Sequence, residues 1–166
     1  EPEGYTSYDL ALDNRDALAG DIYKNAENYY KSVFEHAGGS ISFYPDKNGA
    51  APTAELYHRE TRFISVQDVK EFCKKHGITE NVFFISAFGI TLGKYNFKKD
   101  AVFTTIYHGR NDSRLSETVG MLVKTLPVFC DFSGTAKDCL SGVQKQLIDS
   151  MNNDIYPFSQ ISHEFD

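Results

Sequence analysis

Residues 79–96, TENVFFISAFGITLGKYN, constrain the fold of this chain more than any other segment. Thr79 suits a helix N-cap, and apolar residues follow it on nearly every side of the predicted helix. A helix of this kind is buried, not laid on a surface, so it needs other elements packed on both of its sides. The segment therefore favours a layered α/β fold, and we expect a two-layer α/β sandwich.

Two later segments have the composition of strands that would form the sheet. Residues 101–107, AVFTTIY, alternate β-branched and aromatic side chains and end abruptly at His108, Gly109 and Arg110. Residues 126–132, LPVFCDF, predict a second strand. A third, short strand is predicted within residues 61–66, TRFISV, where it runs directly into a helix.

The N-terminal region predicts one long helix followed by a linker. Asp13 caps this helix, its apolar stripe covers residues 18–34, and the glycine pair at 38–39 ends it. The next twenty residues are polar and contain two prolines and a glycine, as an exposed connection does. We therefore divide the chain into a helical segment at 1–39, a linker at 40–60 and a larger subdomain at 61–166.

Capping residues place two further helices in the larger subdomain. Ser65 begins the first of them, and Gly77 ends it. Thr135 begins the second, because Asp138 stands three residues on and completes a capping box. The break at Tyr156–Pro157 ends this part of the chain, and a short turn is expected to follow.

Composition and charge exclude several classes of function. The 166 residues carry a formal net charge of −6, and their basic runs are no longer than pairs, which argues against nucleic-acid binding. No apolar stretch reaches the ~18 residues of a membrane helix, so no membrane partner is expected. The first residues lack the pattern of a signal peptide, and we expect a cytoplasmic protein.

The sequence contains no metal motif, no nucleotide motif and no catalytic set of its own. Its three cysteines, at 73, 130 and 139, are odd in number and lack C-x-x-C spacing, which favours reduced thiols over disulfides or a zinc site. No histidine pair has metal-ligand spacing, and neither a glycine-rich phosphate loop nor a G-x-S-x-G elbow is present. We therefore expect no metal and no directly bound cofactor.

His108 and Arg110 each leave two interpretations open. A histidine at a strand end can act as a general base, but the absence of a catalytic partner in the sequence favours a single backbone hydrogen bond instead. Arg110 keeps its charge at any depth. If it is buried, it clamps onto a carboxylate, and if it is exposed, it is an ordinary loop residue.

Four segments, in order along the chain, resemble the condensation domain of nonribosomal peptide synthetases, in the chloramphenicol-acetyltransferase-like superfamily. They are YTSYDLAL at 5–12, AVFTTIYHGR at 101–110, VGMLVKTLPVF at 119–129 and NNDIYPFSQI at 152–161. The third is similar to the family's [IV]-G-x-F-V-N-T-L-P-x-R signature, and the apolar helix is similar to the one before the family's Gly-Arg strand. The resemblance implies that the sandwich is one half of the chloramphenicol-acetyltransferase-like fold.

The chain also departs from the family pattern. Lys124 replaces an asparagine, Phe129 an arginine, Asn153 a glutamine and Ser159 a glutamate. The His-His-x-x-x-Asp-Gly active-site motif, which the family carries upstream, is absent. By this resemblance the chain is a C-terminal-half fragment, truncated at its far end, with no catalytic residue and no activity of its own.

The family's chemistry sets the expected function. Two similar halves enclose a tunnel, into which the phosphopantetheine arms of carrier proteins bring an acyl thioester and an acceptor amine. The amine attacks the thioester, and the second histidine of the absent motif positions or deprotonates it. The resemblance thus implies an amide-forming acyltransferase of secondary-metabolite biosynthesis, whose partners are the missing N-terminal half and peptidyl carrier domains.

The resemblance also assigns roles to residues of this chain. Gly109 and Arg110 would form a structural clamp of the active site, with Arg110 paired to the aspartate of the absent motif. The expected floor loop of the tunnel comprises Val119, Gly120, Met121, Leu122, Val123, Lys124 and Thr125. Candidate tunnel-lining residues are His108, Tyr156, Pro157 and Phe158.

Three hypotheses concern the floor loop. Gly120 is expected to allow a backbone geometry that a side chain would block. Lys124 points into the tunnel, pairs with a carboxylate across the two halves, or extends into solvent. Without the other half, residues 119–126 are expected to be exposed, mobile or used in self-association.

Two rival functions remain open. The first is another member of the superfamily, such as an epimerisation or cyclisation domain or a free-standing acyltransferase. The second is a non-catalytic scaffold or carrier-docking module, which the substitutions at Lys124, Phe129 and Ser159 leave open. An intact His-His-x-x-x-Asp-Gly motif upstream would separate the catalytic interpretation from the scaffold.

Overall fold

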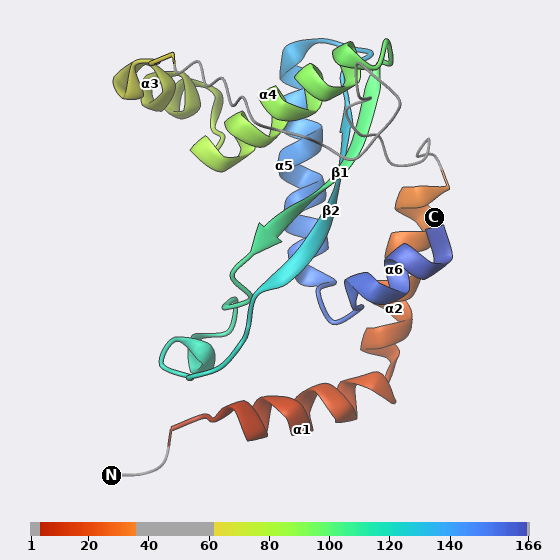
Figure 1. The fold of residues 1–166 in the computed structure, drawn as a ribbon. Coiled ribbons are helices and arrows are strands. Elements are labelled where there is room, and N and C mark those ends of the chain that lie inside the picture. Colours follow the sequence, from red (N-terminus) through yellow and green to blue (C-terminus); the bar gives the residue numbers. More distant parts are fainter. Residues whose placement is uncertain (1–3, 36–61, 166) are drawn as a thin grey trace, which may run out of the picture.

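The computed structural model describes residues 4–35 and 62–165 and shows two strands packed on helices (Figure 1). In chain order the elements are α1 Ser7–Leu18, α2 Asp21–Phe34, α3 Val66–His76, α4 Glu80–Tyr95, β1 Asp100–Tyr107, η1 Ser113–Leu115, β2 Lys124–Asp131, α5 Ala136–Asn152 and α6 Phe158–Phe165. The predicted linker at 40–60 and the glycine pair at 38–39 lie outside the described residues.

The strands predicted near residues 101–107 and 126–132 are present as β1 and β2, and they pair as an antiparallel hairpin. Asp100 pairs with Asp131 at one end of the ladder, and Tyr107 pairs with Lys124 at the other. Side chains alternate between the two faces. Ala101 and its partner Cys130 point into the core, at 1% and 0% exposed.

Helices α4 and α5 cover the core face of the hairpin and complete the two layers (Figure 1). Their buried side chains join those of the strands in one cluster: Val82, Ile85, Leu92, Ala101, Val128, Cys130, Cys139, Leu140, Val143 and Leu147. Close approach needs small residues on α4. A Cβ on Gly93 would lie 2.8 Å from the carbonyl oxygen of Asp100. The predicted α/β two-layer sandwich is confirmed.

Helix α4 is buried on one face only, so the expectation of packing on both sides was wrong. Phe84 and Phe88 on its outer face are 50% and 46% exposed. Phe88 packs edge-on against Phe103 of β1, with 5.0 Å between ring centroids. Within the described ranges, no helix is both long and apolar enough to cross a membrane.

A glutamine side chain forms hydrogen bonds with backbone groups on the outer edge of β2, the edge that faces away from β1. A third strand would otherwise pair along this edge. The Gln146 amide donates to the carbonyl of Pro127 at 2.9 Å, and its oxygen accepts from the Phe129 N–H at 3.4 Å. Gln146 also donates to the Ser150 hydroxyl at 2.8 Å, which the Tyr29 hydroxyl contacts at 3.0 Å. This network fastens α2 to α5 and β2.

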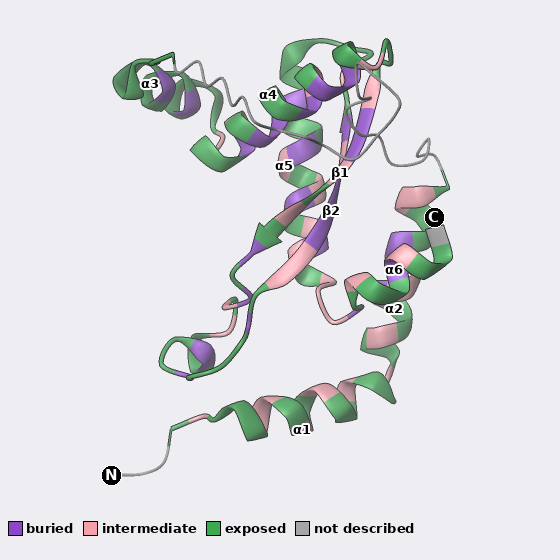
Figure 2. Cartoon of the chain, in the orientation of Figure 1, coloured by how far each residue is buried: buried purple, intermediate pink, exposed green. Residues whose placement is uncertain are grey.

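A second, smaller core joins α2 to α6 and the loop before it. Its buried members are Ala26, Tyr30, Tyr156 and Ile161. Burial raises the pKa of Tyr30, whose hydroxyl donates to the Ser150 carbonyl at 3.4 Å. The two N-terminal helices differ in burial. Helix α2 contributes Ala26 and Tyr30 to this core, whereas α1 has no buried residue (Figure 2).

Two local predictions were wrong. The expected single N-terminal helix is two helices, because the helical conformation breaks after α1 and Gly20 is the N-cap of α2. The first helix also starts earlier than the predicted cap Asp13, because Thr6 and Asp9 form a capping box. The residues before α3 form no strand at 62–65, where Phe63 is 93% exposed. A lone extended segment gains little without a pairing partner, so its β-branched and aromatic composition was not sufficient.

Replacing Thr135 with alanine is expected to lower the free energy of unfolding by about 1 kcal/mol at neutral pH. The Thr135 side chain accepts from the Asp138 N–H, and the Asp138 carboxylate accepts from the Thr135 amide and hydroxyl. These bonds lower the pKa of Asp138. Its stabilisation is therefore present above the unfolded pKa of about 3.9 and is lost as pH falls through the lower folded pKa.

Urea unfolding at neutral and acidic pH tests this prediction. The T135A variant should lose stability at neutral pH and show a shallower acid-side decline than the parent chain. Ser141→Ala, on the exposed side of the same helix, is the control and should change stability little. An unchanged T135A unfolding curve would show that the capping box does not stabilise α5.

Candidate functional site

The turn after β1 rests directly on the expected floor loop. Gly109 has φ +70°, in the left-handed region that favours glycine. A Cβ at this position would lie 1.8 Å from the carbonyl oxygen of Leu122. Glycine is therefore required here for two independent reasons, its backbone conformation and the approach of Leu122.

The Arg110 guanidinium holds the loop that leads from this turn toward the floor loop. It donates to the carbonyl of Leu115 and, at 3.1 Å, to the carbonyl of Thr118. Arg110 is half-buried. Leu115 is the last residue of the short helix η1, and Thr118 lies shortly after this helix. Arg110 thus acts as a clamp on its own loop, while its pairing with a carboxylate stays a prediction.

The His108 ring makes the backbone hydrogen bond that the sequence favoured. Its Nδ1 accepts from the Arg110 N–H at 2.9 Å, so Nδ1 carries no proton in this arrangement. The ring lies 4.7 Å from that of Tyr107, and the residue is exposed. Nδ1 is therefore engaged in the turn, and only Nε2 is directed elsewhere.

The floor loop presents apolar side chains outward. Val119 and Met121 are 91% and 90% exposed, and Val123 is 52% exposed. Leu122 is the inward member, at 6% exposed. The expected exposure of residues 119–126 is thus present at Val119, Gly120, Met121 and Val123, whereas Leu122 and Leu126 are buried.

Gly120 does not have the role expected of it. Its φ lies outside the left-handed region, and a Cβ would meet only the Ser7 Cβ, at 3.4 Å. The glycine that the geometry requires is Gly109, where a carbonyl crosses the turn. The error arose because a sequence shows which glycines are present but not which backbones approach one another.

Lys124 and Thr125 already belong to β2, so the loop ends at Val123. The Lys124 ammonium lies 2.8 Å from the Asp154 carboxylate and donates to the Asp154 carbonyl at 3.1 Å. Both side chains are partly buried, at 34% and 21% exposed. Lys124, the one charged residue of the 119–129 segment, therefore forms an ion pair within this chain. The pair joins two of the segments that carry the family resemblance.

A double-mutant cycle on Lys124→Met and Asp154→Asn is expected to give a coupling of about 0.5–1 kcal/mol. The pair is partly shielded from water, which weakens solvent screening. The Arg15–Asp16 pair, at 70% and 71% exposed, is the control and should show little coupling. Denaturant unfolding of the four chains measures it, and strictly additive effects of the two substitutions would contradict the pairing.

Two hollows flank the Lys124–Asp154 pair. One, of about 470 Å³, lies between α1, Gly109 and the floor loop, with Met121 and Leu122 in its wall. The other, of about 440 Å³, is lined by Val123, Lys124, Thr125 and residues 154–159. The structure thus brings Tyr156, Pro157 and Phe158 together with the end of the floor loop, and His108 lines neither hollow.

Tyr156 contributes to these surroundings mainly as a core residue. It is 4% exposed, and its ring lies 5.1 Å from that of Tyr23 and 5.9 Å from that of Tyr30. Burial raises the pKa of its phenol. Pro157 is exposed and Phe158 is half-buried, so of the three predicted residues these two have more surface to offer a ligand.

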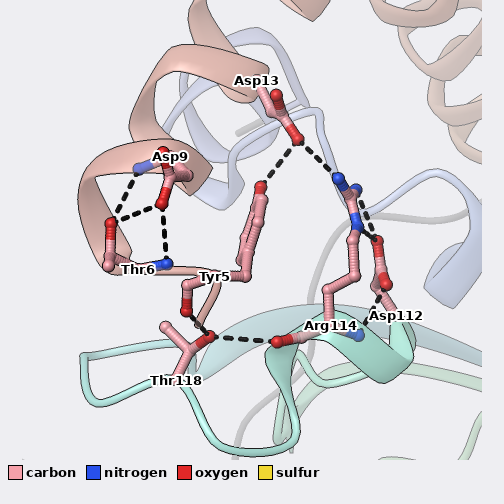
Figure 3. Close-up of polar contacts among 7 residues, drawn as sticks. All are labelled: Tyr5, Thr6, Asp9, Asp13, Asp112, Arg114 and Thr118. Carbon is pink, nitrogen blue, oxygen red and sulfur yellow. Dashed lines mark hydrogen bonds and ion pairs between the residues drawn. The ribbon is translucent and has the colours of Figure 1, made fainter. Parts of the chain in front are cut away.

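A polar network that sequence reasoning missed holds the N-terminal segment against the 112–118 loop (Figure 3). The Tyr5 hydroxyl donates to Asp13 at 2.7 Å, which raises the pKa of Tyr5. Arg114 contacts Asp13 at 3.2 Å, stacks over the Tyr5 ring at 4.5 Å and lowers the pKa of Asp112. The Thr118 hydroxyl completes the contact by donating to the Tyr5 carbonyl at 2.7 Å.

This network and Arg110 both hold the loop, and both contact Thr118. Asp13 and Arg114 are 101 residues apart, and no short-range pattern pairs them. The only hint of this network in the sequence was that Tyr5 lies within the first family-like segment and Asp13 directly follows it. No group of three or more potential metal-ligating side chains occurs within the described ranges.

Comparison with solved structures shows which fold the chain has. SgcC5 from Streptomyces globisporus superposes with a TM-score of 0.76 at 21% identity, over 99% of this chain and 38% of that one. The first condensation domain of the CDA synthetase superposes with a TM-score of 0.75 at 14% identity, over 100% of this chain and 37% of that one. The fold is therefore that of the chloramphenicol-acetyltransferase-like condensation domains.

The sequence identifies the family. The condensation-domain family model matches residues 2–166, and the chain belongs to this family. Similar proteins include nonribosomal peptide synthetase sidC of Arthroderma benhamiae, 28% identical over 135 residues, and bacitracin synthase 2 of Bacillus licheniformis, 24% identical over 159 residues. These matches cover 80% and 92% of this chain but only 3% and 6% of the two synthetases.

Proposed function

We propose that this chain forms one half of the substrate tunnel of a domain that joins carrier-bound acyl and aminoacyl groups through an amide bond. The acceptor amine attacks the thioester carbonyl, the C–N bond forms as the C–S bond breaks, and the amine's proton passes to a base. The carrier's phosphopantetheine thiol is the leaving group. The base, a histidine, comes from the N-terminal half, outside the residues of this chain.

The observation that carries the proposal is the outward apolar face of the floor loop. Val119 and Met121 are almost fully exposed, while the neighbouring Leu122 is buried and its carbonyl oxygen lies close to Gly109. Large apolar side chains exposed together on one loop fit a surface that is buried against another protein body. The family match over residues 2–166 supports the second half-domain as that body.

The remaining residue roles follow from this arrangement. Arg110, fixed by two backbone carbonyls, would present its remaining N–H groups to the aspartate of the catalytic motif. Pro157 and Phe158 would line the tunnel beside the Lys124–Asp154 pair, and His108 would stand at its edge. Peptidyl carrier domains would be the partners and a cytoplasmic compartment the location, with no cofactor held by this chain.

The test is single-turnover amide formation by the full native protein, with acyl-loaded and aminoacyl-loaded carrier domains as substrates. We expect the condensed product to accumulate on the acceptor carrier. We also expect the 166-residue chain alone to form none, because it lacks the base. Amide formation by the chain alone would contradict the assignment of the catalytic histidine to the other half.

The same assay separates the rival functions. Carrier binding without any transfer would support a non-catalytic docking module instead. Inversion of the aminoacyl stereocentre without condensation would support an epimerisation domain. The Lys124–Asp154 pair does not favour either rival, because an ion pair at the tunnel wall is compatible with transfer.

A further inference from the structure

Two buried cysteines, which the proposed transfer reaction does not use, lie side by side in the core. The sulfur atoms of Cys130 and Cys139 are 3.4 Å apart. Both residues carry free thiols, and they are 0% and 2% exposed. Cys130 lies on β2 and Cys139 in the first turn of α5, so the pair joins the two layers of the sandwich.

Local structure fixes this separation. Asp131 accepts from the Ser133 N–H at 2.8 Å, which holds the turn that leaves β2. The capping box between Thr135 and Asp138 then starts α5, and Cys139 follows Asp138 directly. On the other side, a Cβ on Gly89 of α4 would lie 2.7 Å from both Cβ and Sγ of Cys130, so Cys130 is packed tightly.

The two thiols are not equivalent. The two sulfur atoms share a hydrogen bond in which either can be the donor, and this bond lowers the pKa of Cys139. The same bond and burial raise the pKa of Cys130. Cys139 lines a hollow beside α5 and Cys130 does not, so Cys139 is the thiol of the pair that a small oxidant meets first.

A hollow of about 290 Å³ lies beside Cys139, which is itself 2% exposed. It lies between the outer edge of β2 and α5, and Cys139 is part of its lining with Phe129, Gly142 and Gln146. Gly142 stands three residues after Cys139, and a Cβ there would meet nothing within 4 Å. The missing side chain at this position leaves the approach open.

We propose that Cys130 and Cys139 form an oxidative modification site, at which a hydroperoxide converts the dithiol to an intramolecular disulfide. The Cys139 thiolate attacks the peroxide oxygen, the O–O bond breaks, and the products are a sulfenic acid and one water or alcohol. The Cys130 sulfur then attacks the Cys139 sulfur and expels the sulfenic oxygen as water. Two electrons pass from the two thiols to one peroxide.

The disulfide requires only a small movement. The sulfur atoms must approach from 3.4 Å to the ~2.05 Å of an S–S bond. The bond would fasten β2 to the start of α5, and a dithiol reductant would reverse it. This site is independent of the transfer reaction, so either proposal can fail without the other.

Peptide mapping of the full native protein after treatment with hydrogen peroxide tests the proposal. We expect the peptides that contain Cys130 and Cys139 to become linked, with a loss of about 2 Da for the two hydrogens, and dithiothreitol to restore them. Cys73 is the internal control, because it is buried at 4% exposure and has no thiol neighbour among the described contacts. Equal oxidation of Cys73 under the same conditions would indicate general unfolding and would overturn the proposal.

Variants separate the two steps and the route of access. In C130S, Cys139 should stop at the sulfenic acid, which a dimedone probe traps, whereas C139S should give no dimedone adduct at Cys130. Gly142→Leu should slow the linkage at least severalfold by covering the hollow, while Gly142→Ala should leave its rate near that of the parent. Equal linkage rates in both Gly142 variants, or unchanged thiols in the folded parent, would contradict the site.

Discussion

Gly109→Ala is expected to destabilise the chain by about 3 kcal/mol or more. The left-handed conformation at φ +70° costs about 1–2 kcal/mol for a residue with a Cβ. The new methyl group would also begin 1.8 Å from the Leu122 carbonyl oxygen, so the floor loop must move. In the full native protein we expect amide formation to fall about 100-fold, since a shift of the order of 1 Å near a reacting centre has that effect.

Gly77→Ala is the matched control for this prediction. Gly77 has nearly the same backbone conformation, φ +65°, but a Cβ there would meet nothing within 4 Å. It should therefore show the conformational cost alone, about 1–2 kcal/mol, with activity retained. Urea unfolding measures the stabilities, and equal losses in the two variants would show that the Gly109–Leu122 contact carries no energetic weight.

Arg110→Ala is expected to have the second largest effect. Its guanidinium makes charge-assisted hydrogen bonds to the carbonyls of Leu115 and Thr118, and losing such bonds costs about 1.5–3 kcal/mol. If the aspartate of the other half pairs with the same guanidinium, removal of the arginine also strands a buried carboxylate. We therefore expect a further loss of stability, and at least a tenfold fall in amide formation, in the full native protein.

Two further variants sharpen this test. Arg110→Lys keeps the charge but cannot reproduce the planar fork, so it should recover only part of the lost activity. Arg15→Ala, at an exposed position on α1, should change neither stability nor activity measurably. Unchanged folding stability and activity of the Arg110→Ala protein would rule out its role as a clamp.

The elements that depend on short-range patterns could be predicted from the sequence. Ser65, Thr79 and Thr135 each accept a hydrogen bond from the backbone N–H three residues on, as their positions predicted. The hairpin strands and the glycine stop at Gly77 also agree with the prediction. In each case the decisive interactions lie within about one turn of helix or one strand, so neighbouring residues carry the signal.

The candidate site depends on contacts that no short-range sequence pattern reveals. The start of α1 was misplaced because both Thr6 and Asp13 are good caps, and only the Thr6–Asp9 box forms. Lys124 was left with three possible environments, and its partner Asp154 stands 30 residues away. The family resemblance placed both residues in motifs, but it could not show that the two motifs touch.

The central claim is that the outward face of the floor loop packs against a second half-domain. Hydroxyl-radical labelling of the full native protein, folded and in urea, measures how far each side chain is protected. Met121 is 90% exposed in this chain, and Phe97, at 98%, is the reference outside the proposed contact. We predict strong protection of Met121 in the folded protein and none of Phe97, whereas equally weak protection of both would contradict the account.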